Sequence, residues 1–89
     1  MIEHAQQTIS LHMEKGLHLR PAQRLASYAE TFQAQIFLTF HGNKASVQSV
    51  LEILGLEVLG PCELTISAEG PDAVSAVNAV CSFLRGLAA

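Results

Sequence analysis

The residues best suited to chemistry form one short segment, where an expected strand gives way to an expected helix: Gly16-Leu17-His18-Leu19-Arg20-Pro21-Ala22. Gly16 permits a sharp turn, and His18 stands where the helix begins. The first amides of a helix have no partner inside it, and together with the helix dipole they attract anions. Pro21 has no amide hydrogen. We therefore expect a phosphate to be bound by the remaining amides of this turn, those of Leu19, Arg20 and Ala22.

The imidazole of His18 is a nitrogen nucleophile that is partly neutral near pH 7. A phosphoryl group on its ring would be a reactive phosphoramidate, and the Arg20 guanidinium would stabilise the charge without covalent chemistry. Such a ring must be exposed, because the active site of a partner has to reach it. The residues alone leave two interpretations open: His18 carries a phosphoryl group, or it only caps a helix.

Alternation of polar and apolar residues predicts the strands around this segment. Residues 7–12 alternate, with Ile9 and Leu11 on one face and polar side chains on the other. Further strands are expected over residues 35–40, 44–47 and 62–68, with turns at 41–43 and at Gly60-Pro61.

Three helices are expected between and after these strands. Small and apolar residues at Ala22, Leu25, Ala26 and Ala29 lie on one face of a helix over residues 19–29. A helix of one or two turns is expected over residues 50–54, between Ser49 as its N-cap and Gly55 as its stop. The last helix is expected to open with Pro71 at its first position and Asp72 beside it.

The resulting order, β-α-β-β-α-β-α, indicates an α+β fold with a four-stranded antiparallel sheet and three helices on one face. A chain of 89 residues leaves room for one core, so we expect a single domain over residues 1–89.

Composition excludes several classes of function. Only five Lys and Arg are present, so a basic footprint for nucleic acid is missing, although Lys15, Arg20 and Arg24 gather three of them near one place. No apolar run is long enough to span a bilayer, and no signal segment is recognisable. We expect Cys62 and Cys81 to be buried thiols, which favours a reducing cytoplasm.

The other histidines, His4, His12 and His41, lack partners at the spacing that metal sites require. We therefore expect neither a metal nor a cofactor.

The segment around His18 resembles the active-site motif of the HPr family, the phosphocarriers of the bacterial phosphotransferase system. Residues 46–51 resemble the segment that holds the regulatory serine of that family, and residues 64–70 resemble its last strand and turn. The resemblance runs from about Gln7 to Leu87. It implies an open-faced β-sandwich, in agreement with the element order.

The resemblance also implies roles for individual residues. His18 would accept a phosphoryl group on Nδ1 from enzyme I, which obtains it from phosphoenolpyruvate, and Arg20 would assist. The group would then pass to IIA-type components of sugar permeases. Ser49 stands where a serine kinase modifies some relatives. We expect the chain to act as a monomer.

A docking surface is expected beside His18. A helix as short as residues 50–54 cannot bury all its sides, and exposed apolar side chains often mark a contact surface. We expect this surface to comprise apolar residues of the helix and of the active-site segment: Leu17, Leu19, Val50, Leu51 and Leu54.

Several alternatives stay open. Leu19 stands where the family usually has a small or hydroxyl residue, and the sequence does not decide between the sugar and nitrogen branches. Two other roles stay open: the chain is a regulatory protein that acts through contacts with other proteins, or it is a domain of a multiphosphoryl transfer protein. An enzyme with His18 as general base is disfavoured, because no recognisable partner set accompanies it.

Overall fold

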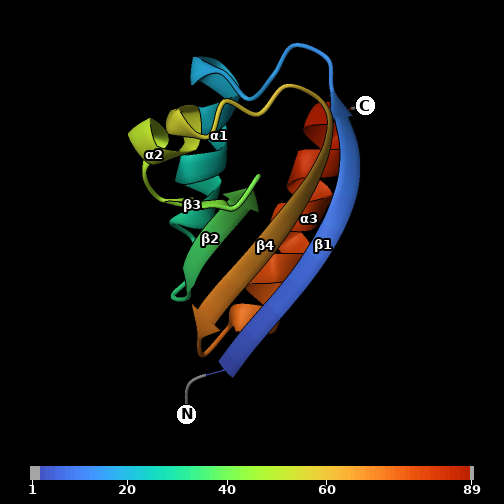
Figure 1. Ribbon diagram of the computed structural model, residues 1–89. Coiled ribbons are helices and arrows are strands. Elements are labelled where there is room, and N and C mark those ends of the chain that lie inside the picture. Colours follow the sequence, from blue (N-terminus) through green and yellow to red (C-terminus); the bar gives the residue numbers. More distant parts are fainter. Residues whose placement is uncertain (1–2, 89) are drawn as a thin grey trace.

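The chain forms the predicted succession of strands and helices, and the computed structural model describes residues 3–88 (Figure 1). The strands are β1 (Glu3–Met13), β2 (Gln35–Phe40), β3 (Asn43–Ser46) and β4 (Gly60–Gly70). The helices are α1 (Leu19–Ala29), α2 (Val50–Gly55) and α3 (Ala73–Ala88).

The four strands form one antiparallel sheet in the order β1-β4-β2-β3. The two long strands, β1 and β4, pair over their full length, from Glu3 opposite Gly70 to Met13 opposite Gly60. Near the middle of this pair the hydroxyls of Thr8 and Thr65 hydrogen-bond at 2.9 Å. The predicted fold class is confirmed.

The helices cover one face of the sheet, and α3 packs along β1 and β4 (Figure 1). The core between these layers contains fully buried residues from both: Leu25, Ile36, Leu38, Ile53, Leu64, Ile66, Val80 and Leu84. Burial of each such side chain contributes about 1.5–3 kcal/mol to stability. Alternate side chains of β1 face the core and the solvent as predicted, with Ile9 buried and Ser10 exposed.

The long strands extend beyond their predicted ends. β1 begins at Glu3 rather than at residue 7, and β4 includes Pro61, which was expected in a turn but lies opposite His12. Pairing between the two strands continues through residues whose own polarity pattern is weak. β3 ends at Ser46, one residue early, yet the Val47 N–H still donates to the Ile36 carbonyl at 2.9 Å.

The start of α3 also differs from expectation. The helix begins at Ala73, because the Asp72 carbonyl accepts its first hydrogen bond, from Ala76. The Asp72 carboxylate accepts the N–H groups of Gln33 at 2.9 Å and Ala34 at 2.8 Å. Asp72 therefore fastens the α1–β2 loop to the start of α3 instead of capping its own helix.

The end of α2 lies later than predicted. Gly55 is its last residue, and the left-handed backbone conformation falls on Glu57, with φ of 55°.

Among residues 3–88, no helix is long and apolar enough to cross a membrane.

The two cysteines differ in burial. Cys81 is buried, as predicted, whereas Cys62 is only half-buried, and both are free thiols. Burial raises the pKa of each thiol; the Met13 backbone partly opposes this at Cys62, and the charge of Arg85 does so at Cys81.

Candidate functional site

A tight loop between β1 and α1 presents His18. The Gly16 N–H donates to the Met13 carbonyl at 3.0 Å, and the Leu17 N–H donates to the Val58 carbonyl at 3.0 Å. Figure 1 shows the segment between α2 and β4 running close to this loop. The Leu17 side chain is 4% exposed and belongs to the core. The residue before His18 is therefore fixed by both its backbone and its side chain.

Glycine is required at position 16. Its φ of +75° lies in the left-handed region, and a Cβ there would stand 2.9 Å from the Val58 carbonyl oxygen and 3.2 Å from Leu59 Cδ1. The absence of a side chain lets the loop approach the α2–β4 segment closely enough for the Leu17 hydrogen bond to form.

His18 occupies the N-cap position of α1 with an extended backbone, φ of −87° and ψ of −166°. Its side chain is exposed, and within the described residues it accepts no capping hydrogen bond from α1. A histidine serving only as a cap would use its ring for that bond. The His18 ring is therefore not used as a cap and stays accessible to solvent.

The first turn of α1 leaves fewer free amides than predicted. The Ala22 N–H donates to the His18 carbonyl at 2.9 Å, so it is unavailable to a phosphate and its predicted role is corrected. The Leu19 and Arg20 amides precede the first helical hydrogen bond and stay at the open end of the helix. The Arg20 side chain is exposed beside His18.

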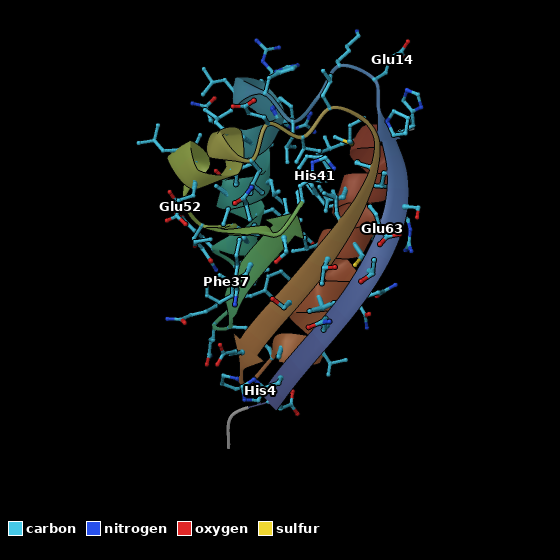
Figure 2. The ribbon with its side chains drawn as sticks, in the orientation of Figure 1. His4, Glu14, Phe37, His41, Glu52 and Glu63 are labelled. Carbon is cyan, nitrogen blue, oxygen red and sulfur yellow. The ribbon has the colours of Figure 1, made fainter. Side chains whose placement is uncertain are left out.

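A depression lies on each side of His18. One, of about 370 Å³, is lined by the loop, the first turn of α1 and the end of α3: Met13, Glu14, Lys15, Gly16, His18, Pro21, Leu87 and Ala88. The other, of about 340 Å³, separates the loop from the α2–β4 segment and is lined by Lys15, Gly16, Leu17, His18, Leu54, Glu57, Val58 and Leu59. Lys15 lines both depressions, which adds a second cation beside His18. In Figure 2, Glu14 lies at the same end of the molecule.

The predicted docking residues divide into two groups. Leu19 is 53% exposed and Leu51 82% exposed, whereas Val50 and Leu54 are half-buried, and Leu54 lines the second depression with His18. The prediction for Leu17 is wrong, because that side chain is buried and anchors the loop.

One exposed residue at this surface was missed. Leu59 is 62% exposed and lines the second depression. It lies between an expected helix and an expected strand, where no periodicity indicates which way a side chain points.

Ser49 caps α2 as predicted. Its hydroxyl accepts the Glu52 N–H at 3.3 Å, and the Glu52 carboxylate in turn accepts the Ser46 N–H at 3.0 Å. This arrangement resembles a capping box and accounts for Ser49 structurally. Modification of Ser49 by a kinase stays a prediction.

The comparisons with known proteins agree with this site. The family described as "PTS HPr component phosphorylation site" matches residues 5–85. Phosphocarrier protein HPr of Vibrio cholerae is 35% identical over 79 residues, which cover 89% of this chain and 93% of that protein.

Solved structures of HPr share the fold. HPr from Bacillus anthracis superposes with a TM-score of 0.84 at 29% identity, covering 90% of this chain and 95% of that one. HPr from Thermoanaerobacter tengcongensis gives a TM-score of 0.85 at 29% identity, covering 93% of each chain. The chain therefore belongs to the HPr family of phosphotransferase-system phosphocarriers.

Proposed function

We propose that the chain carries a phosphoryl group on His18 from enzyme I to IIA-type components of sugar permeases. The observation that carries this proposal is the free, exposed imidazole of His18 at the open amide end of α1, next to Arg20. A carrier needs a nucleophile that two successive partners can reach, and an exposed N-cap position meets that need.

The transfer forms one bond and breaks one. The Nδ1 lone pair of neutral His18 attacks the phosphorus of phosphorylated enzyme I, and the bond between that phosphorus and the donor breaks. In the onward step, a side chain of the acceptor attacks the same phosphorus, and the bond between the phosphorus and Nδ1 of His18 breaks. The Leu19 and Arg20 amides and the Arg20 guanidinium stabilise charge on the phosphoryl oxygens.

This environment suits temporary rather than permanent binding. Arg20 and Lys15 are both exposed, so water screens their charges and weakens their hold on the phosphoryl group. A group held in this way stays available to the next partner.

Apolar side chains around the ring provide the contact surface. Leu19, Leu51 and Leu59 are exposed, and Val50 and Leu54 lie half-buried with them. Exposed leucines near a reactive group are typical of a docking site.

The proposed carrier acts in the cytoplasm as a monomer. The free thiols of Cys62 and Cys81 agree with a reducing cytoplasm. Action as a monomer stays a prediction, which sedimentation velocity checks.

Reconstitution tests the proposed relay. Phosphoenolpyruvate, enzyme I from the same genome, this chain and a IIA domain are combined, and phosphorylation of the IIA domain is followed. We expect phospho-IIA only when the chain is present and His18 is intact. Equal phosphorylation of the IIA domain without the chain would refute the carrier role.

A further inference from the structure

Glu57 has a backbone conformation that favours glycine. Its φ of 55° lies in the left-handed region, which is unfavourable for a residue with a Cβ. Its neighbours Leu56 and Val58 are buried, at 7% and 3% exposure, and they hold the chain in this shape while Glu57 itself is exposed. Strain of this kind at an exposed position suggests a role outside the folding of the chain.

The Glu57 carboxylate is available to an external partner. Among residues 3–88 the ion pair within 4.0 Å joins His4 to Glu69, so Glu57 is not neutralised by an intramolecular cation. The nearby Glu52 differs, because its carboxylate accepts the Ser46 N–H at 3.0 Å.

Glu57 stands at an apolar depression that opens beside the reacting group. It lines the depression of about 340 Å³ together with Leu54, Leu59 and His18, and Lys15 lines the same depression without approaching within 4.0 Å as an ion pair. A protein that brings a phosphorus atom to the His18 ring from the side of α2 would cover this depression. An apolar hollow with a charged rim suits one apolar anchor side chain and a charged neighbour.

Charge is divided across the surface around His18. The loop and α1 carry three exposed cations, Lys15, Arg20 and Arg24, and one exposed acid, Glu14. On α2 and the segment after it the exposed charged residues are both acidic, Glu52 and Glu57. A uniformly acidic partner would be attracted on the first side and repelled on the second. The complementary partner carries a cation on the second side.

We propose that Glu57 determines partner specificity: its carboxylate pairs with a Lys or Arg that the phosphoryl donor presents beside an apolar side chain seated against Leu54 and Leu59. This inference rests on the proposed function and adds the chemistry of the partner's contact surface. The pairing acts on encounter and binding, not on the phosphoryl transfer step.

Kinetics with enzyme I and phosphoenolpyruvate test the pairing. We expect Glu57→Gln to raise the KM for this chain about threefold and Glu57→Lys about tenfold, with kcat unchanged. The KM of the Gln variant should also depend less on salt than that of the wild type. Glu63→Lys is the matched control, since Glu63 is exposed on β4, away from α2 in Figure 2, and should leave KM unchanged.

Glu57→Gly separates a docking role from a structural one. Glycine relieves the left-handed strain, so the denaturation midpoint should not fall, while KM should rise as in Glu57→Gln. A lower midpoint with an unchanged KM would assign Glu57 to the fold and overturn the inference.

Two outcomes distinguish a failure of the proposed function from a failure of this inference alone. Wild-type chain that accepts no phosphoryl group from enzyme I would refute the carrier role and this inference with it. Wild-type chain that is phosphorylated normally, with an equal KM for Glu57→Lys, would overturn this inference alone.

Discussion

Substitution of Gly16 by alanine tests how the loop positions His18. The Cβ of the new residue would lie 2.9 Å from the Val58 carbonyl oxygen, which is the acceptor of the Leu17 N–H. To avoid this contact the loop must move away from the α2–β4 segment. Leu17 would then lose or lengthen its hydrogen bond, and His18 would shift with it.

The cost of Gly16→Ala has two parts. A left-handed conformation costs a residue with a Cβ about 1–2 kcal/mol, and the lower entropy of the unfolded alanine variant offsets part of this. Loss of the Leu17–Val58 hydrogen bond costs about 0.5–1.5 kcal/mol more. With a net left-handed cost of about 1 kcal/mol, we expect the free energy of unfolding to fall by about 1.5–2.5 kcal/mol in total.

Gly42→Ala is the matched control. Gly42 has φ of +79°, close to the +75° of Gly16, but an added Cβ there meets no described atom within 4 Å. Only the left-handed cost applies, so we expect a loss of about 1 kcal/mol. Urea denaturation of both variants isolates the contribution of the close approach at Gly16.

The two variants should also differ in function. A displaced nucleophile lowers the rate of transfer steeply, and we expect kcat with enzyme I to fall about tenfold or more in Gly16→Ala. Gly42→Ala should transfer at the wild-type rate, because the β2–β3 turn takes no part in the site. Equal stability and equal transfer in both variants would refute the positioning role of the Val58 contact.

Three further predictions concern single side chains. Arg20→Ala should slow phosphoryl transfer while changing the free energy of unfolding by no more than about 1 kcal/mol, as stopped-flow transfer and urea denaturation would show. Leu51→Glu should raise the KM for enzyme I without changing phosphohistidine hydrolysis, whereas Val74→Glu, at an exposed position near the start of α3, should change neither. Burial raises the pKa of the Cys81 and Cys62 thiols, so less thiolate forms at mildly alkaline pH. A disulfide reagent should therefore modify both thiols more slowly in the folded protein than in the urea-unfolded protein. In the folded protein it should modify buried Cys81 more slowly than half-buried Cys62.

Local patterns predicted much of the architecture. The apolar face of α1 and the cap at Ser49 depend on residues three or four positions apart, so a single sequence reveals them. The position of His18 at the start of α1 was predictable for the same reason, because Gly16 and Pro21 mark the turn before the helix and its first turn, whereas its proposed role came from the family resemblance.

Features that depend on distant contacts were not predictable. Leu17 lies in a loop, and its burial follows from packing around Val58, which no local pattern encodes. Asp72 suits a helix start by type, yet its carboxylate binds backbone amides that the fold brings from residues 33–34. The left-handed Glu57 depends in turn on the burial of both its neighbours.

The assignment of Ala22 failed for a different reason. Its amide is the first to find a partner inside α1, the His18 carbonyl at 2.9 Å, so it is not among the free amides of the first turn. The helix start at residue 19 was predicted correctly, and the error was to count the amide of the fourth helical residue among the free ones.

The proposed carrier role requires that His18 itself hold the phosphoryl group. This is checked by intact-mass measurement after incubation with phosphoenolpyruvate and enzyme I, with wild-type and His18→Ala chains compared before and after acid treatment. We predict that the wild-type chain gains one acid-labile phosphoryl group and that folded His18→Ala gains none. Phosphorylation of His18→Ala at the wild-type level, or an acid-stable product in the wild type, would contradict the account.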